Sequence, residues 1–452
     1  MNNSTMYDLT HAGGVPYPET NKYHYDKWFT TTGLTDGKEY KTIRFNIRQD
    51  NLMLHWVNSY MTLEGRLVKK AGEAVVYTDT QKISLIHNAI PHLFSNVKLT
   101  VGNKLVENVN QVGHVSSMMY NVLYPRSKGK CDGLEFMWLP DTTADSSTDN
   151  KGFEARRKYL LSQPATAGNF RFRIPMHMFF GFMENFVVLK GYPIEIEMVR
   201  GPDYPAIYRL GAGAGNAEEG KLVFSNITLD IPIVEPSTPV ALEFLKGVSD
   251  PEPYLFSFRQ RHGMYAPVPD GIQDFQQPIT STFYTERPSM IWVGFQTVNT
   301  VDQTHNYALY KNANVQSMYI QMNNTQFPPN IIKADWAANN SGFFYEAQQH
   351  VRANYLQYPA RYTEGNMLDP VKFRDLYTIY CFDVSKQEMT LGSNNTTCSL
   401  HVFFKEATPE HLRVYIAWFN DRTLELFTDG SPINIRKEID NYSSNNNNSE
   451  ID

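Results

Sequence analysis

The chain has 452 residues, a mass of 51.9 kDa and a formal net charge of −6. A single hydrophobic core stops growing well below this length, so we expect two domains. The negative charge argues against a protein that coats nucleic acid, and the absence of an apolar run of about 18 residues argues against a membrane span.

The first half of the chain is predicted to form β-strands joined by turns and short helices. Residues 1–40 lack periodicity and are predicted to be an N-terminal arm. Ile43, Phe45 and Ile47 alternate with polar residues, as in a half-buried strand. Similar patterns predict strands at 60–69, 97–101, 170–174, 194–198 and 227–233, and helical spacing predicts short helices at 83–94 and 112–122.

The second half repeats these patterns after a Pro-rich segment, which we predict to be a linker at residues 237–253. A helix is predicted at 343–357 and strands at 290–294, 318–322, 376–384, 398–405 and 412–419. Residues 41–236 and 254–436 are therefore predicted to be the two domains, and 437–452 a flexible C-terminal tail.

Two short segments support an internal duplication. Val97–Asn103 can be aligned with Met318–Asn324, which begins 221 residues later, and each copy precedes a predicted helix. Two all-β domains of about 200 residues with many Pro-rich turns favour sandwiches or jelly rolls.

No motif predicts catalysis, a cofactor or a metal site, so we expect none of these. Gly211–Gly215 lacks the spacing of a phosphate-binding loop, and Ser116-Ser117 lacks the pattern of a nucleophile elbow. Glu195 and Glu197 are predicted to lie on the exposed face of a strand. The run Arg156–Lys158 could touch nucleic acid, but we favour a solvated or intersubunit charge cluster.

The three cysteines do not form a disulfide or zinc pattern. Cys131, Cys381 and Cys398 are few and odd in number, which suggests a reducing compartment. Cys381 and Cys398 could meet on neighbouring strands, yet we favour free thiols. Residues 1–10 have no apolar core, so we expect no secretory signal peptide.

The segment Asn88–Glu107 resembles a pattern of the double jelly-roll major capsid proteins of the polinton, adintovirus and virophage-like group of eukaryotic dsDNA viruses. In that family, "N-x-I-x-x-L-F-S-x-V-x-L" spans a helix and a strand hairpin. Further similar segments follow in the same order, at Asn150–Arg157, Phe170–Arg200, Arg287–Gly294, Phe373–Asp383 and Leu400–Phe419.

The resemblance implies an all-β fold of two tandem eight-stranded jelly rolls with short helices in the connections. It further implies a non-enzymatic major capsid protein located in the virion. This protein would trimerise into pseudo-hexameric capsomers of an icosahedral shell around a dsDNA genome. Its partners would be neighbouring capsomers, penton proteins and minor capsid proteins, with no specific nucleic-acid binding. Three predicted loops become candidates for capsomer towers and intersubunit contacts, at 126–152, 201–220 and 323–342.

Two alternatives stay open from the sequence. One is a minor capsid or spike protein of a similar virus. The other is a carbohydrate-binding protein or glycosidase built on two β-sandwiches, which needs an acidic or aromatic groove that one sequence does not reveal.

Overall fold

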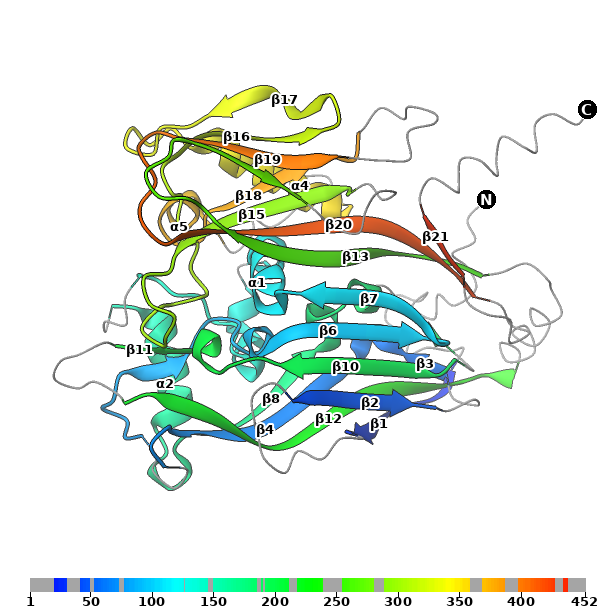
Figure 1. Cartoon of the computed structure of the whole chain (residues 1–452). Helices are drawn as coiled ribbons and strands as arrows, with labels where there is room; N and C mark the ends of the chain where they lie inside the picture. Colours follow the sequence, from blue (N-terminus) through cyan, green and yellow to red (C-terminus); the bar gives the residue numbers. More distant parts are fainter. Residues whose placement is uncertain are drawn as a thin grey trace, which may run out of the picture.

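The structure is a computed structural model of the whole chain. Its fold is described for residues 20–30, 41–48, 53–72, 77–125, 127–144, 149–184, 188–189, 192–210, 218–238, 254–279, 288–357, 368–386, 397–426 and 434–437. Within these residues the strands form five antiparallel sheets, which are arranged as two successive β-units (Figure 1).

The first unit contains two main sheets. One has the order β1-β12-β4-β8 and the other the order β2-β10-β6-β7. The strands are β1 (Thr20–Phe29), β2 (Thr42–Ile47), β4 (Tyr60–Lys69), β6 (Phe94–Val101), β7 (Lys104–Asn110), β8 (Asn169–Pro175), β10 (Ile194–Arg200) and β12 (Gly220–Pro236). Four shorter strands extend this unit, namely β3 (Met53–His55), β5 (Ile83–Leu85), β9 (Val188–Leu189) and β11 (Ile207–Arg209).

The second unit also contains two sheets, with the orders β13-β20-β15-β18 and β14-β19-β16-β17. Its strands are β13 (Tyr254–Pro267), β14 (Asp274–Pro278), β15 (Met290–Thr297), β16 (Val315–Met322), β17 (Thr325–Lys333), β18 (Ile379–Asp383), β19 (Cys398–Phe404) and β20 (Leu412–Leu426). A short strand, β21 (Asn434–Lys437), pairs with the end of β20.

The two units have the same topology. When the eight main strands of each unit are counted in chain order, both units pair them as 1-8-3-6 in one sheet and 2-7-4-5 in the other. This is the strand order of a jelly roll, so the prediction of two tandem eight-stranded jelly rolls is confirmed. The aligned segments Val97–Asn103 and Met318–Asn324 both run from the fourth strand into the turn before the fifth.

Local sequence explains these elements. In β2 and β10 every second side chain is buried, as the alternating isoleucines require. Gly102 and Asn103 both have positive φ angles, 53° and 66°, which a tight hairpin turn between β6 and β7 demands. Buried residues of the two units share one continuous hydrophobic cluster, and a second cluster fills the inside of the second roll.

In the described part of the chain, four α-helices connect the strands: α1 (Val112–Leu123), α2 (Lys151–Leu161), α4 (Gly342–Leu356) and α5 (Pro370–Asp375). The helices predicted at 112–122 and 343–357 are confirmed. In the structure the first of them has no exposed face, since all twelve residues of α1 are buried. The reason is that α1 lies between the two rolls and contacts both of them.

Several segments differ from their prediction, and one of them is the surface loop predicted at 201–220, which contains strand β11. Residues 83–94 do not form one helix, because Ile83–Leu85 pair with β11 and only Ile90–Leu93 form a short 3₁₀ turn. Residues 323–342 are not one surface loop, since Thr325–Lys333 form β17. Part of the predicted arm is strand β1, so the sheet of the first roll begins at Thr20 rather than at residue 41. Most of the predicted linker and tail lies outside the described residues.

Candidate functional site: the polar junction between the rolls

The basic run Arg156–Lys158 was predicted to lie in solvent or between subunits. The structure corrects this for Arg156 and Arg157, which are buried, whereas Lys158 is exposed. Arg156 belongs to α2, and its side chain has no exposed surface. Its Nη2 lies 2.7 Å from Oδ1 of Asp141, which is equally buried, and its Nε donates to the carbonyl oxygen of Leu85 at 2.9 Å. The helix turns this arginine inward because Phe153 and Leu160 on the same element are buried too.

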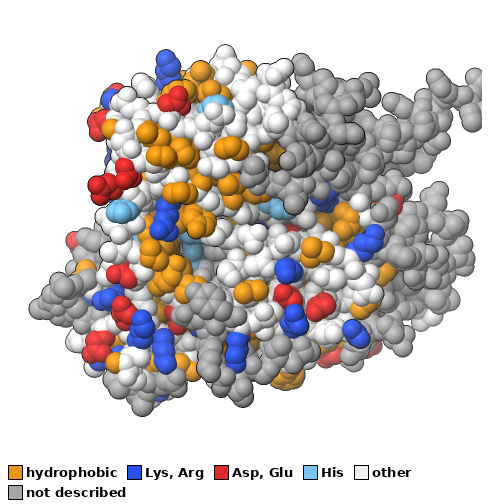
Figure 2. All heavy atoms as spheres, in the orientation of Figure 1, with side chains coloured by type: hydrophobic (Ala, Val, Ile, Leu, Met, Phe, Trp, Pro, Cys, Tyr) orange, Lys and Arg blue, Asp and Glu red, His pale blue; other side chains and the backbone are white. Residues whose placement is uncertain are grey.

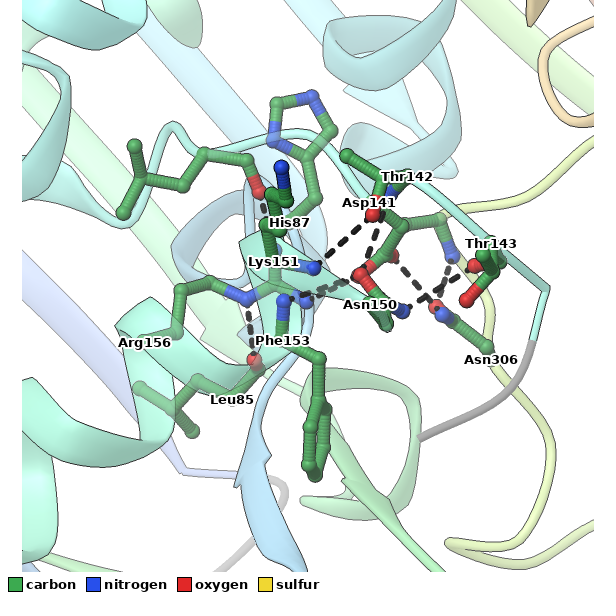
Figure 3. A network of polar contacts seen from close by, with 12 residues as sticks. Leu85, His87, Asp141, Thr142, Thr143, Asn150, Lys151, Phe153, Arg156 and Asn306 are labelled. Carbon is green, nitrogen blue, oxygen red and sulfur yellow. Dashed lines mark hydrogen bonds and ion pairs between the residues drawn. The ribbon is translucent and has the colours of Figure 1, made fainter. Parts of the chain in front are cut away.

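Asp141 is the centre of a compact hydrogen-bond network (Figure 3). Oδ1 of Asp141 also accepts a hydrogen bond from Nδ2 of Asn150 at 3.0 Å. Asn150 in turn caps α2, because its Oδ1 accepts from the backbone N–H of Phe153 at 3.2 Å. A buried carboxylate with several donors and an arginine partner is satisfied, so it stabilises this corner instead of being left without compensation.

Residues of the second roll complete this network. Asn306 donates from Nδ2 to Oδ2 of Asp141 at 3.0 Å, and the backbone N–H of Asp141 donates to the hydroxyl oxygen of Tyr377 at 2.7 Å. Nearby, Gln303 pairs with the backbone of Gly220 in both directions, at 2.6 and 2.8 Å. The connection between β15 and β16 therefore reaches down onto the first roll, as Figure 1 shows.

A second ion pair, between a buried arginine and a half-buried glutamate, joins the rolls where β13 packs against β7. Arg261 on β13 has no exposed surface, and its Nη2 lies 2.6 Å from Oε1 of Glu184. The same guanidinium donates to the hydroxyl of Tyr120 at 3.0 Å and to the carbonyl oxygen of His177 at 2.7 Å. Tyr355 of α4 donates its hydroxyl to the other oxygen of Glu184.

Glu107 of β7 lies fully buried beside this pair. Its carboxylate accepts three backbone N–H groups, from Gly181 and Arg261 at 3.0 Å and from Phe182 at 3.2 Å. Burial raises the pKa of Glu107 to about 7, and the charge of Arg261 together with these hydrogen bonds opposes the rise. The contact is close, because a Cβ atom on Gly181 would lie 1.8 Å from the carbonyl oxygen of Arg259.

Histidines of and around α1 form the third part of the junction. The ring of His114 stacks on Tyr415 with centroids 3.7 Å apart, and its Nδ1 lies 3.0 Å from the hydroxyl of Tyr310. His92 lies 2.9 Å from the hydroxyl of Ser117. Burial lowers the pKa of His92 to about 3 and that of His114 well below its ordinary value, so both rings are neutral near pH 7.

The other sequence candidates are not brought together. Ser116 and Ser117 accept hydrogen bonds from Asn88 inside a buried helix, which agrees with the structural interpretation of that segment. Glu197 is paired with Arg44 and Lys98 near the surface. Gly211–Gly215 lies outside the described residues.

The cysteines are not paired in a disulfide. Cys381 and Cys398 are free, and they lie on β18 and β19, which belong to different sheets and are not neighbours. Among the residues that the structure describes, no group of three or more His, Cys, Asp or Glu side chains could hold a metal ion. No helix in that part of the chain is long and apolar enough to cross a bilayer.

The junction fixes how one roll sits on the other. It combines a buried helix with two ion pairs of buried arginines. Asn306 of the second roll completes the Arg156–Asp141 pair, and the Arg261–Glu184 pair itself links the two rolls. Sequence reasoning missed Asp141, Glu107 and Arg261, because no local pattern marks a charge that pairs across 15 to 154 residues. The signal that could have found Arg156 is its place beside Phe153 and Leu160 on a helix.

Comparison with known proteins agrees with this architecture. Residues 145–424 match the model of the double jelly roll-like domain. A search of the curated proteins finds no match. Among solved structures, the chain is similar to that of the Sputnik virophage, with a TM-score of 0.60 and 12% identity over 95% of this chain and 91% of the other.

Two further structures are similar at the level of the fold. The mavirus major capsid protein has a TM-score of 0.53 and 12% identity, covering 94% of this chain and 91% of that one. The Faustovirus major capsid protein has a TM-score of 0.53 and 9% identity, covering 92% of each. Because the family model matches more than half of the sequence, this chain belongs to the double jelly roll-like family.

Proposed function

We propose that the protein is a major capsid protein that trimerises into pseudo-hexameric capsomers of an icosahedral shell around a dsDNA genome. The observation that carries the proposal is the rigid pairing of two jelly rolls of identical strand order through a buried polar junction. Three such chains supply six similar units, which a closed cyclic arrangement can set in a ring. The similar structures of virophage and Faustovirus capsid proteins support it.

The surface chemistry fits a shell that does not condense nucleic acid. Figure 2 shows Lys and Arg interspersed with Asp and Glu over the lower, first roll, and few charged side chains over the second roll on the same face. The whole chain carries a net charge of −6. A protein that neutralises phosphates needs a continuous basic surface, so we propose that genome packing is left to other proteins.

The proposed role is structural and in the virion, with penton and minor capsid proteins as further partners. The experiment is light scattering coupled to size-exclusion chromatography, followed by negative-stain microscopy. We expect a particle of three times the 51.9 kDa chain mass and pseudo-hexagonal outlines. A strict monomer that forms no lattice at high concentration would contradict the proposal.

Copy number separates the major from a minor capsid or spike role. Quantitative mass spectrometry of purified particles is expected to find this chain as the most abundant protein of the shell. A few copies per particle would favour the minor role instead.

A further inference from the structure

The contact between the rolls within one chain uses two distinct faces. On the second roll it uses the outward side of β13, and on the first roll the strand β7 with the first turn of α1. A Cβ atom on Gly263 would lie 2.4 Å from Cγ2 of Val115 and 2.6 Å from the carbonyl oxygen of Asn110. Nε2 of Gln260 donates to the carbonyl oxygen of Val106 at 3.1 Å.

Since both rolls have the same topology, each of these faces has a counterpart in the other roll. Gly263 of β13 pairs with Ala417 of β20, and Ala417 pairs on its other side with Trp292, the third residue of β15. Phe29 of β1 pairs with Thr228 of β12, and Thr228 pairs on its other side with Thr62, the third residue of β4. The registers therefore make Phe29 on β1 the counterpart of Gly263. By the same count, Lys27 is the counterpart of Arg261.

Each counterpart face carries exposed apolar side chains, although Thr228 and Asp230 of β12 on the first of these faces are buried. Phe29 is 66% exposed and Tyr25, on the same side of β1, is 43% exposed. On the second roll, β17 and α4 follow one another as β7 and α1 do in the first. Phe343 in the first turn of α4 is 63% exposed and Ile331 on β17 is 48% exposed. In contrast, all of α1 is buried between the two rolls.

The two exposed faces cannot meet within one chain. Figure 1 places β1 at the lower side of the first roll and β17 at the upper side of the second. Two different faces on opposite sides of a molecule make a head-to-tail contact between copies, which forms a ring when the rotation closes. A large exposed aromatic side chain is a typical anchor of such an interface.

We propose that the outward face of β1, with Tyr25, Lys27 and Phe29, binds the first turn of α4 and the strand β17 of a second copy of this chain. The contact repeats between copies the arrangement in which β13 binds α1 and β7 within the chain. This inference rests on the proposed function only in taking a second copy as the partner. It goes further by naming the two faces and their polarity.

Site-specific cross-linking tests the contact and its polarity. In a Cys131→Ser background, which removes the exposed native thiol, Phe29→Cys and Phe343→Cys are made separately and in one chain. Cys381 is buried and Cys398 half-buried, so both stay as they are. A short bismaleimide is added to each variant and to the two single variants after co-expression.

We expect each single variant alone to remain uncross-linked. The co-expressed pair should give a covalent dimer, and the double variant should give a covalent trimer. Dimers from Phe29→Cys alone would indicate a symmetric contact and overturn the proposal. A light-scattering trimer without any of these cross-links would overturn this contact while leaving the proposed function standing, whereas a protein that does not trimerise would contradict both.

A charge substitution gives an independent measurement. Phe29→Asp and Phe343→Asp place a carboxylate in the proposed apolar contact, so we expect each to weaken trimer formation about tenfold or more in sedimentation at decreasing concentration. The matched control is Val301→Asp, at a residue that is 54% exposed in the connection between β15 and β16 and belongs to none of the elements of the proposed contact. An unchanged trimer in Phe29→Asp and Phe343→Asp, as in the control, would overturn the proposal.

Discussion

Arg156 and Arg261 are both fully buried, and each is held by a carboxylate and by carbonyl oxygens of the neighbouring chain segments. Such a charge is tolerated only while its partners stay in place, because transfer of an unpaired ion into the protein interior is strongly unfavourable. The orientation of the two rolls thus depends on a few residues, and the surrounding apolar contacts do not specify it as sharply.

Substitution Asp141→Ala tests this dependence at the first pair. It leaves the guanidinium of Arg156 buried without its carboxylate, so we expect the free energy of unfolding to fall by about 3–5 kcal/mol. The control Glu197→Ala removes a carboxylate that pairs with Arg44 and Lys98 near the surface, where the loss should be about 0–1 kcal/mol. Urea denaturation measures both. Equal losses in the two variants would show that the buried pair has no special role.

Sequence patterns predict residues of this kind poorly. Alternation identified Glu195 correctly as exposed, because its neighbours Ile194 and Ile196 face the core. The same logic failed for Arg156, whose burial depends on Asp141 and on Asn306 of the other roll. Spatial pairing of distant residues leaves no periodic signal, so the strands could be predicted while the junction could not.

At the scale of elements, the rolls touch where backbone approaches backbone. Gly181 lies in the 3₁₀ turn Gly181–Glu184 and faces the carbonyl oxygen of Arg259 on β13. A methyl group at this position would overlap that oxygen at 1.8 Å, so neither side can relax by rotating a side chain. This glycine is required by the contact between the units.

We therefore expect Gly181→Ala to destabilise the protein by about 1–3 kcal/mol. The matched control is Gly342→Ala at the start of α4, where nothing lies within 4 Å of the new atom and alanine favours a helix. Thermal unfolding followed by circular dichroism compares the two. A Gly181→Ala protein as stable as wild type would mean that the junction adjusts more freely than its geometry indicates.

The helix α1 and the 3₁₀ turn Ile90–Leu93 pack against each other, and three histidines of this region are buried: His87, His92 and His114. Burial lowers the pKa of His87 and His92 to about 3. The unfolded chain, with an ordinary histidine pKa near 6.5, therefore binds protons that the folded protein excludes. The contribution of these neutral histidines to the free energy of unfolding is complete above pH 6.5 and is lost as the pH falls from there towards 3.

Glu107, whose pKa is raised to about 7, has the opposite pH dependence. Its contribution to the free energy of unfolding is lost as the pH rises from about 4.5 to 7.

Replacing one of these rings should remove part of the acid sensitivity. Between pH 6.5 and 5 each neutral buried histidine accounts for about 2 kcal/mol of lost stability, so His92→Gln should lose that much less over this interval. The control is His411→Asn, at an exposed histidine with a positive φ of 62° that asparagine tolerates. Urea denaturation at pH 6.5 and 5 measures the change in the free energy of unfolding. The same change in His92→Gln and in wild type would show that the His92 ring does not cause this part of the acid sensitivity.

At the scale of elements the sequence was informative where periodicity is strong. The strand of Ile43, Phe45 and Ile47, the strand at 194–198 and the hairpin at Gly102-Asn103 were predicted correctly, because alternating burial and turn chemistry are local properties. Strand β1 was missed because its outward side chains include Tyr25 and Phe29, so hydrophobicity does not alternate along it. An apolar residue that stays at the surface for a contact between copies would remove the alternation of apolar and polar residues in this way.

For the whole molecule, the topology of the two rolls is repeated but their surroundings are not. The outward face of β13 and β20 is covered by the first roll through Arg261, Gly263 and Phe419. On the equivalent face of the first roll, Thr228 and Asp230 of β12 are buried too, whereas Tyr25 and Phe29 of β1 are exposed. Duplication of a stable unit can thus produce one contact inside the chain and a second, similar contact between chains. The number of domains followed from length and composition, while this asymmetry required the coordinates.

The shared junction should make the two rolls unfold as one unit. One hydrophobic cluster includes Ile196 of the first roll and Phe419 of the second, so separating the rolls exposes core residues of both. We expect a single calorimetric transition for the wild type. Arg261→Ala leaves Glu184 and Glu107 without their buried cation and should lower the midpoint and resolve two transitions.

The control for this variant is Arg44→Ala, which removes a half-exposed partner of Glu197 and should keep one transition. Two well-separated transitions already in the wild type would show that the rolls are energetically independent. An unchanged single transition in Arg261→Ala would show that the apolar contacts alone couple them. Coupling through Arg261 would instead mean that the geometry required for a six-unit ring is built into each chain as it folds, before any second copy is met.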